Sequence, residues 1–368
     1  MSVNPLDIAY RGKVAAHGDF HAHAATGGTS DGLTTLAEWS DFMDSAGTDF
    51  VAIVDHRQVR HTYLPEWDDR RFICGTEPGT YMEGCRAAED SGLHYNMIFP
   101  RQGLLEEVLN LFPEFGYTRM GVAPADDDHE GHFEYPHFTY DRMRQLVQAV
   151  RERGGIFTHN HPTTIMRSDD IMDYYFCDFH NIEIIYYYPE YEHSERAYRL
   201  WKSLIEAGCR VYAIAGGDEH GRPNTGGLST VYVAEKTASA YVEAAHRGDM
   251  TCGAIGIRMY VTDGTDMVVT GDTWTGGDAR LYIRVGDAYP GNFDGEAEYT
   301  LDIYKDSIIV YTEAFTGLKP VDVELPFDVD CLFYRAEVTH AGTGVRVAIG
   351  NPIFSSGAHT SPDILQED

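Results

Sequence analysis

Short apolar runs alternate with segments of helical period along the first two thirds of the chain, from residue 14 to residue 253. This alternation constrains the fold most, because it is typical of a parallel sheet whose strands are joined by helical crossovers. Strands are predicted at residues 14–23, 50–55, 71–75, 94–99, 155–159, 182–187 and 211–215. We therefore expect an α/β fold in this region.

Three apolar stripes between these runs have the spacing of helices that pack on a sheet. They comprise Leu36, Trp39, Phe42, Met43 and Ala46; Met143, Leu146, Val147 and Val150; and Leu200, Trp201, Leu204 and Ile205. Thr35 and Glu38 predict a capping box before the first stripe, because their side chains can satisfy each other's free backbone N–H groups. Gly47, Gly154 and Gly208 follow the stripes and are expected to end the helices.

From about residue 256 the pattern changes to β-rich runs at residues 280–285, 299–312, 321–325 and 345–349, separated by Gly and Asp turns. These runs predict a small all-β sandwich. The predicted domains are therefore residues 1–255 and residues 256–368. A long insertion at about residues 100–140 interrupts the first domain, and its acidic stretch, residues 126–132, is interpreted as a solvated loop in preference to a further cation site.

The chain of 368 residues carries a formal net charge of −30. Such a charge disfavours nucleic acid and anionic membranes as partners, because both are bound chiefly by Lys and Arg. The first residues lack the apolar core of a signal peptide, and no later stretch is apolar for the roughly 20 residues that a membrane span needs. We expect a cytoplasmic protein with no membrane partner, whose six dispersed cysteines are reduced thiols.

Residues that commonly bind metals recur at the ends of the predicted strands. His21 and His23 end the first strand, where side chains two residues apart point the same way. Later strands end in, start with or precede His56, Glu77, His94, His161, Asp218 and His220. Functional groups from separate strands meet at one face of a β/α barrel, so this recurrence predicts a shared polar site.

The motifs resemble the PHP domain, the polymerase and histidinol phosphatase superfamily. They are His21-Ala-His23, Ser30-Asp31-Gly32, Val54-Asp55-His56, Gly75-Thr-Glu77, Leu93-His94, Asn160-His161-Pro162 and Gly217-Asp218-Glu-His220. The resemblance covers about residues 14–255 and implies a distorted seven-stranded, TIM-like β/α barrel, (β/α)7, with two or three divalent ions. The loop between His23 and Asp31 is longer than is usual in the superfamily. A looser resemblance, at residues 222–225, 238–247 and 348–354, is to the branch that includes carbaryl hydrolase.

The resemblance also implies a set of metal ligands. His21, His23, Glu77 and Asp218 would hold the first ion. Glu77 would bridge to a second ion that His94 and His161 complete. His56 and His220, with Asp31, would hold a third ion or bind the substrate directly.

Mixed imidazole and carboxylate ligands suit Zn, Mn or Fe, whereas calcium prefers oxygen ligands alone. Paired ions can activate a shared water, so the expected nucleophile is a metal-bridging hydroxide and no Ser or Cys nucleophile is needed. The predicted catalytic residues are Glu77, Asp218 and His220.

A ligating imidazole usually donates its second N–H to a carboxylate or a carbonyl. Asp19, Asp55 and Glu183 are placed in the sequence for this orienting role, with buried pairing to Arg as the alternative interpretation. His159 is a rival of His161, because the two can share one face of a strand. The His-Pro dipeptide favours His161 as the ligand and leaves His159 as a supporting residue.

Arg222 follows His220 on the predicted rim, where a guanidinium could bind phosphate or carboxylate. It is a predicted substrate-binding residue together with His56 and His220, and a loop arginine paired with an acid is the alternative. Arg57 and Arg60, just after His56, have a weaker case of the same kind.

The leading hypothesis is a multinuclear metal-dependent hydrolase that cleaves a small anionic phosphate ester, foremost a phosphomonoester. A second hypothesis keeps the metal centre and changes the bond to a carboxylic ester, a carbamate or an amide. A third is a ligand- or carbohydrate-binding protein whose barrel has no catalytic activity. The second hypothesis shares its fold and metal site with the first, so substrates must separate them.

Overall fold

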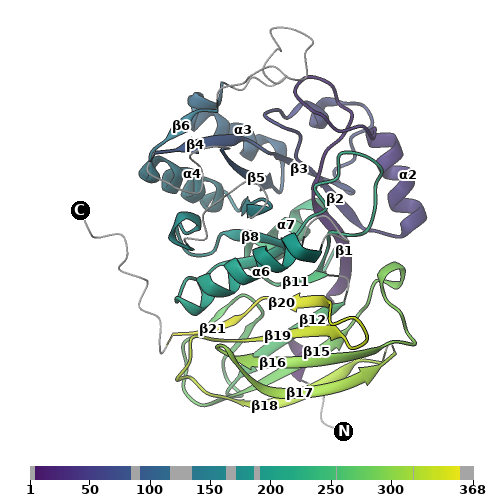
Figure 1. Ribbon diagram of the computed structural model, residues 1–368, viewed down its shortest axis with the longest axis vertical. Coiled ribbons are helices and arrows are strands. Elements are labelled where there is room, and N and C mark those ends of the chain that lie inside the picture. Colours follow the sequence, from purple (N-terminus) through teal and green to yellow (C-terminus); the bar gives the residue numbers. More distant parts are fainter. Residues whose placement is uncertain are drawn as a thin grey trace.

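The computed structural model describes residues 5–83, 92–116, 135–162, 171–185, 191–253, 255–317 and 319–356. They form a mixed α/β structure in which helices accompany the strands of the first two thirds, while the last third is almost entirely strands (Figure 1). No described helix has both the length and the apolar composition needed to cross a membrane. The five described cysteines are free thiols, as predicted for this part of the chain.

Seven strands of the first two thirds hydrogen-bond in an unbroken series that follows the order of the sequence. They are β1 (Val14–Ala22), β2 (Phe50–Ile53), β3 (Phe72–Thr76), β5 (Leu93–Phe99), β7 (Ile156–His159), β8 (Asn181–Ile185) and β9 (Tyr212–Ala215). A parallel bridge between Ala22 and Glu219 joins the end of β1 to the segment after β9, so the two ends of the series meet.

The prediction of an all-parallel sheet is wrong at β5. This strand is antiparallel to both of its neighbours, β3 and β7. The short strand β4 (Gly79–Met82) lies between β3 and β5 in sequence and pairs with β5 in antiparallel fashion. Only 16 residues separate β3 from β5, too few for β4 and a parallel crossover helix together.

The sheet does not stop at β1. Strand β10 (Leu228–Val233) pairs with β1, β11 (Met250–Gly253) pairs with β10, and β20 (Arg346–Gly350) pairs with β11, all antiparallel. None of β10, β11 and their pairings was predicted from the sequence. Through β11 and β20 the first part of the chain shares one hydrogen-bonded sheet with the last third.

The three predicted apolar helices are present. They are α2 (Leu36–Ala46), α4 (Tyr140–Glu152) and α6 (Tyr191–Glu206), and α1 (Pro5–Ala9), α3 (Gln102–Leu111) and α7 (Ala238–His246) accompany them. The capping box of Thr35 and Glu38 is confirmed, and Gly47 ends α2 with a φ of 74°, a conformation that glycine adopts without strain. Helix α3 lies within the predicted insertion, whose acidic stretch at residues 126–132 falls outside the described residues.

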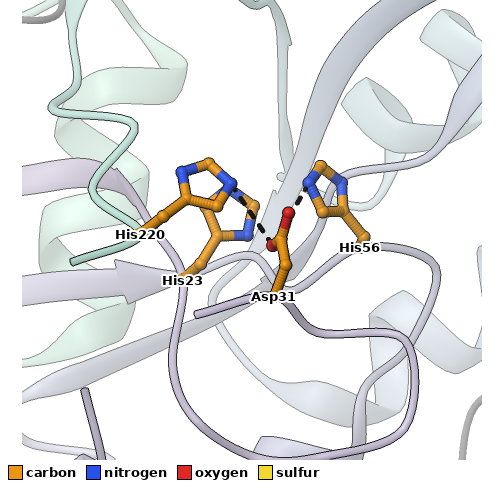
Figure 2. A group of neighbouring side chains, drawn as sticks. All are labelled: His23, Asp31, His56 and His220. Atoms are coloured by element: carbon orange, nitrogen blue, oxygen red, sulfur yellow. Dashed lines mark ion pairs between the residues drawn. The ribbon is translucent and has the colours of Figure 1, made fainter. Parts of the chain in front are cut away.

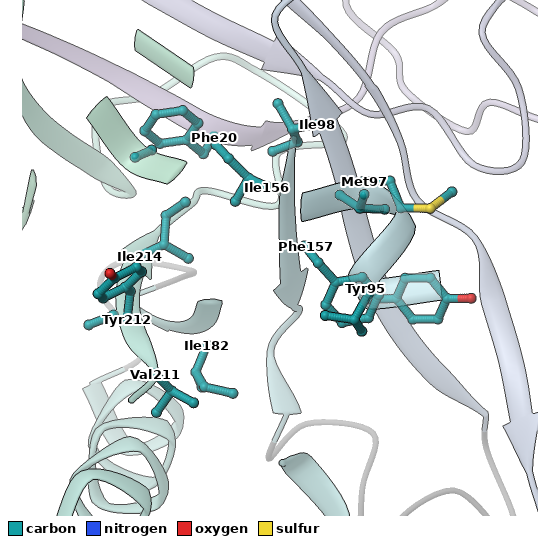
Figure 3. Packing of buried hydrophobic residues seen from close by; sticks show 14 of the residues in the cluster. Phe20, Tyr95, Met97, Ile98, Ile156, Phe157, Ile182, Val211, Tyr212 and Ile214 are labelled. Carbon is teal, nitrogen blue, oxygen red and sulfur yellow. The ribbon is translucent and has the colours of Figure 1, made fainter. Parts of the chain in front are cut away.

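The main core lies between these helices and the strands. Phe20, Ile98 and Ile156, from β1, β5 and β7, belong to one buried cluster (Figure 3). Tyr95 and Phe157 stack there with ring centroids 4.8 Å apart. Burial of these strands on both faces explains why they read as continuous apolar runs rather than alternating ones.

Two sheets of the last third enclose a second buried cluster. One contains β12 (Gly256–Thr262), β13 (Met267–Val269), β15 (Ala279–Gly286) and β18 (Val321–Phe327). Strands β14 (Thr273–Trp274), β16 (Glu298–Lys305), β17 (Ile308–Thr316), β19 (Phe333–His340) and β21 (Ile353–Ser355) belong, with β20, to the other. The predicted run 299–312 is two strands, because Asp306 turns the chain with a φ of 54°.

Side-chain contacts cross the predicted boundary between the two parts of the chain. Leu6 and Tyr10, in and just after α1, pack with Tyr232 of β10 and Tyr260 of β12. Tyr10 also donates a hydrogen bond to the Met259 carbonyl at 3.2 Å. Leu6 and Tyr10 therefore contact strands on either side of the predicted boundary at residue 255.

Candidate metal centre

Nine side chains of the types that bind metal ions gather into three overlapping groups. Within each group, one donor atom from every residue lies within 4.8 Å of the others. The groups are His21, His23, Glu77 and Asp218; Glu77, His94 and His161; and His23, Asp31, His56 and His220. These are the nine residues predicted as ligands from the sequence, and the structure brings all of them together.

The strands explain this convergence. His21 and His23 lie at the end of β1, Glu77 directly follows β3, and His161 and Asp218 come shortly after β7 and β9. These strands run in one direction, so their carboxyl ends share an edge. His94 is the second residue of β5, and because β5 is antiparallel its beginning lies at that same edge.

The first group is tightly packed, and its residues are buried except for Asp218, which is partly exposed. His21 Nε2 lies 3.0 Å from Asp218 Oδ1 and 3.4 Å from Glu77 Oε2. His23 Nε2 lies 3.2 Å from the same Glu77 oxygen and 3.3 Å from His21 Nε2. Two imidazole nitrogens and two carboxylate oxygens thus face one common point.

The second group uses the other oxygen of Glu77. His94 Nδ1 lies 3.2 Å from Glu77 Oε1, and His161 Nε2 lies 3.5 Å from it. His161 Nε2 is also 3.6 Å from Asp218 Oδ2. Glu77 therefore lies between the first two groups, with one oxygen facing each.

Asp31 joins the third group from the long loop after β1. Figure 2 shows its carboxylate between the rings of His56 and His220. Asp31 Oδ1 lies 3.3 Å from His220 Nε2 and 3.6 Å from His56 Nε2. A side chain at Gly32 would meet the backbone of Ala24 at 2.5 Å, so the return of this loop toward β1 requires glycine there.

The electrostatics of the site keep its carboxylates ionised. Burial raises the pKa of Glu77, but the nearby imidazoles, led by His56 and His21, outweigh it and hold that pKa well below its usual value. Burial likewise raises the pKa of Asp31, but His220 and His56 outweigh burial and lower that pKa to about 2. Anionic oxygens held among imidazoles are prepared to bind a cation.

Two of the imidazoles respond in the opposite sense, whereas burial lowers the pKa of His56 to about 4. Burial lowers the pKa of His21, but the carboxylates of Glu183, Asp218 and Glu77 outweigh burial and raise it well above its usual value. Burial is also outweighed at His23, whose pKa rises to about 9 through Asp218 and Glu77. The raised pKa values of His21 and His23 show that negative charge is concentrated around these two rings.

Three predicted orienting carboxylates contact the ligands or the backbone beside them. Glu183 lies 3.0 Å from His21 Nδ1 and accepts the backbone N–H of His161 at 2.8 Å. Asp19 Oδ1 accepts the backbone N–H groups of His21 and Gly217, at 2.8 and 2.9 Å. Asp19 is buried, and burial raises its pKa to about 7 despite these two donors.

Asp55 organises the start of the long loop rather than a ligand ring. Its carboxylate accepts the backbone N–H of Ala24 at 2.8 Å and the hydroxyl of Thr26, and it lies 3.2 Å from His61 Nδ1. Both Asp55 and His61 are fully buried. This pair orders the segment that leads from His23 toward Asp31.

Two predicted site residues lie away from the three groups. His159 packs against Phe157, Phe176 and His180, because the chain turns after β7 and His161 adopts a φ of 27° instead of continuing the strand. Arg222 is exposed, and no ion pair among the described residues connects it to the groups. The two-residue spacing therefore does not bring His159 to the face that His161 occupies.

Sequence reasoning missed two neighbours of the ligands. Asn160 donates from Nδ2 to Glu77 Oε1 at 2.8 Å and to Asn96 Oδ1 at 2.9 Å. Tyr135 Oη lies 3.1 Å from His94 Nε2. Asn160 adjoins His161 in the Asn-His-Pro motif and could have been noticed, whereas nothing around Tyr135 in the sequence marks it.

Two of the candidate ligands have a backbone conformation that residues with side chains rarely adopt. His161 has a φ of 27° and Asp218 a φ of 48°. Such conformations cost about 1–3 kcal/mol each and persist only where surrounding contacts enforce them. Here the Glu183 carboxylate, bonded to the His161 N–H, is one such contact.

The donor set fits divalent transition metals. Histidine nitrogens and carboxylate oxygens are suited to Zn, Mn or Fe, and Glu77 has one oxygen available to each of two ions. No cysteine takes part in any of the three groups. The described residues thus provide places for divalent cations without fixing which metal binds.

Comparison with known proteins gives matches among solved structures only. No family model matches the chain, and no curated protein matches it. A two-domain protein from Bacteroides vulgatus, described as containing a predicted PHP-like metal-dependent phosphoesterase, is 14% identical with a TM-score of 0.39. That match covers 94% of this chain and 96% of the other.

Two further matches are partial. An amidohydrolase from Chromobacterium violaceum, with bound sulfate and no metal, is 15% identical over 57% of this chain and 89% of its own, with a TM-score of 0.39. The lesion-specific endonuclease EndoQ from Pyrococcus furiosus is 15% identical over 63% of this chain and 56% of its own, with a TM-score of 0.41.

Proposed function

We propose that this protein is a metal-dependent hydrolase that binds two or three divalent ions, Zn, Mn or Fe, and cleaves a small phosphate ester, foremost a phosphomonoester. One observation carries the proposal: nine imidazole and carboxylate side chains, from the ends of several strands and the adjoining loops, meet in three groups. The first group shares Glu77 with the second and His23 with the third. Buried ionisable groups are costly, and a cluster of them at one edge of a sheet is the usual sign of a functional site.

The proposed architecture follows from the strand series. We propose that β1 to β9 close into a distorted (β/α)7 barrel, supported by the parallel bridge between Ala22 and Glu219. Residues 256–368 are proposed to form a β-sandwich domain, supported by the buried cluster between the two sheets of the last third. The candidate site then lies at the carboxyl ends of the barrel strands, where β/α barrels carry their functional groups.

Divalent ions bound here would supply Lewis-acid polarisation of the substrate and a lowered pKa for a bound water. The residues of the chain have three tasks. Glu77 and Asp218 hold negative charge at the centre of the first two groups, and His94 and His161 complete the second group. Glu183 fixes the ring of His21 through Nδ1, so that Nε2 faces the common point.

The proposed substrate is a small anionic molecule and not a nucleic acid. A chain with a net charge of −30 repels an extended phosphate backbone, whereas a single phosphate experiences mainly the local field of the bound cations. His56 and His220, at the more open third group, are proposed to contact the substrate or a third ion.

Metal content and a substrate panel test the proposal. The purified protein is analysed for metal and assayed with p-nitrophenyl phosphate, a phosphodiester, a carboxyl ester and a carbamate, with and without added Mn or Zn. We expect phosphate release that depends on metal. Cleavage of the carboxyl ester or carbamate without phosphate release would favour the second hypothesis, and full metal occupancy without any turnover would favour a binding protein.

The substitution His21→Ala tests the site assignment. Removing a ligand from the first group is expected to lower metal content and to reduce the rate at least about 100-fold, because removal of even a partner outside the ligand set costs about 10–100-fold. His340→Ala, on β19, is the matched control and is expected to leave both quantities unchanged. A His21→Ala protein with full metal content and full activity would refute the assignment.

A further inference from the structure

Tyr135 lies beside the second group, although no motif in the sequence drew attention to it. Its hydroxyl oxygen is 3.1 Å from His94 Nε2, and the two rings meet edge to face with centroids 5.8 Å apart. His94 directs its other nitrogen, Nδ1, toward Glu77. The phenol therefore contacts the side of His94 that faces away from the common point of that group.

The position of the Tyr135 ring is built into the fold. A side-chain carbon at Gly79 would overlap the ring, and one at Gly92 would come within 2.8 Å of it. Tyr81 meets the same ring edge-on at 5.5 Å. A glycine in β4 and a glycine directly before β5 thus leave room for the ring, so that Tyr135 is held against His94.

Arg57 places a positive charge beside the ring of Tyr135. Its guanidinium carbon lies 5.7 Å from the centroid of the Tyr135 ring. Arg57 directly follows His56, adopts a φ of 52°, and its backbone N–H donates to the Glu77 carbonyl at 3.2 Å. The unusual backbone conformation and this hydrogen bond anchor the arginine between the second and third groups.

The hydrogen-bonding capacity of these groups determines what they can bind next. A histidine that bound metal through Nδ1 would carry its proton on Nε2, so Tyr135 would accept from His94. The phenol O–H proton then remains to be donated. A guanidinium has five N–H donors and no acceptor, so the pair offers donors and positive charge together.

We propose that Arg57 and Tyr135 form an anion-binding subsite that holds an oxygen of a phosphate or phosphate-like substrate group beside the second group. This inference rests on the proposed function and identifies the contact that the sequence assigned to Arg222. Arg222 is exposed and has no ion pair with the three groups among the described residues, whereas Arg57 is half-buried directly after His56. A guanidinium shielded from water binds an anion more strongly than an exposed one.

Calorimetric titration of inorganic phosphate into the metal-loaded protein tests the subsite without requiring turnover. We expect Arg57→Gln to raise the phosphate Kd about tenfold or more, Arg57→Lys to raise it less, and Tyr135→Phe to raise it about fivefold. Metal content, measured in parallel, should remain unchanged in Arg57→Gln. Arg101→Gln and Tyr311→Phe, both outside the site, are the matched controls.

The remaining outcomes contradict either the subsite or the proposed function. Phosphate affinity that is unchanged in Arg57→Gln, or lowered instead in Arg222→Gln alone, would overturn the subsite. A metal-loaded protein that binds no phosphate would overturn it as well. Failure of the wild-type protein to bind metal at all would refute the proposed function itself, and that result is read from metal content before any phosphate is added.

Discussion

Glu77 is a single residue whose side chain contacts all three groups. Its Oε2 lies 3.2 Å from both His23 Nε2 and His56 Nδ1, while its Oε1 accepts from Asn160. Its backbone contributes too, because its N–H donates to the Val54 carbonyl at 2.9 Å. One residue thus fixes the distance between neighbouring groups, and its replacement should disturb all of them together.

The buried carboxylate of Asp55 makes the stability of the fold depend on pH. Burial raises its pKa, but His61 and the donors Thr26 and Ala24 outweigh burial and hold the pKa below its usual value. A carboxylate whose pKa is lower in the folded than in the unfolded state stabilises the fold above the unfolded value of about 3.9. That contribution is lost as the pH falls from there through the folded value.

Urea unfolding between pH 3 and pH 7 measures this effect. Asp55→Asn should lower the free energy of unfolding by about 3 kcal/mol near pH 7, since it removes one partner of a buried pair. The difference from wild type should shrink below about pH 4. Asp41→Asn, on the exposed face of α2, is the control, and a difference from wild type that stays constant with pH would contradict the prediction.

Residue-level prediction succeeded where chemistry and position coincide. His21, His23 and Asp218 are recognisable because each stands at the end of an apolar run. The spacing of His159 and His161 does not place both at the site, because a spacing of two predicts a shared face only while the strand continues, and the strand ends there. Tyr135 reaches His94 through tertiary packing against glycines, which leaves no local pattern in the sequence.

At the scale of elements, local signals were predictable and pairing directions were not. The cap and stripe of α2 depend on residues within one helix, and both are confirmed. The reversed direction of β5 depends on which strand it joins, which is a non-local choice. His94 nevertheless reaches the common edge, because a reversed strand begins where its neighbours end.

The N-cap of helix α2 contributes to the stability of the protein. Thr35 accepts the Glu38 backbone N–H at 3.2 Å, and Glu38 accepts the Thr35 backbone N–H at 2.9 Å. Thr35→Ala should lower the free energy of unfolding by about 1 kcal/mol, because it removes the N-cap. Urea unfolding measures the loss, and Ser45→Ala, near the other end of the helix, is the control.

The same helix is bonded to the candidate site. Trp39 Nε1 donates to the His23 carbonyl at 3.2 Å, so the helix position and a ligand backbone are connected. Metal affinity in Thr35→Ala should stay close to wild type, since the cap lies one turn away from this bond. A large loss of metal without a loss of stability would contradict the interpretation of Thr35 as a cap.

The last third of the chain hydrogen-bonds to the loop that carries Asp218 and His220. Thr225 donates from Oγ1 to Asn292 Oδ1 at 2.7 Å, and Asn292 donates from Nδ2 to the Thr225 carbonyl. Nearby, the Tyr289 hydroxyl donates to the Ala46 carbonyl at 2.5 Å. The segment between β15 and β16 therefore contacts both α2 and the loop after β9.

Asn292→Ala should loosen that loop. The loss of two partly exposed hydrogen bonds is expected to speed amide hydrogen exchange in residues 219–226 by roughly twofold to tenfold. Metal affinity of the third group should fall with it, because His220 lies on this loop. Thr312→Ala, which removes the distant hydrogen bond to Asp302, is the control, and equal exchange in both variants would contradict the coupling.

Strand pairing between β11 and β20 also constrains how the chain can be made. During synthesis from the amino terminus, β11 emerges more than 90 residues before the strand that will cover its edge. Until then a row of backbone N–H and C=O groups stays open to pairing with another chain. The nascent protein therefore passes through a stage at which aggregation competes with folding, and that stage ends only when β20 has been translated.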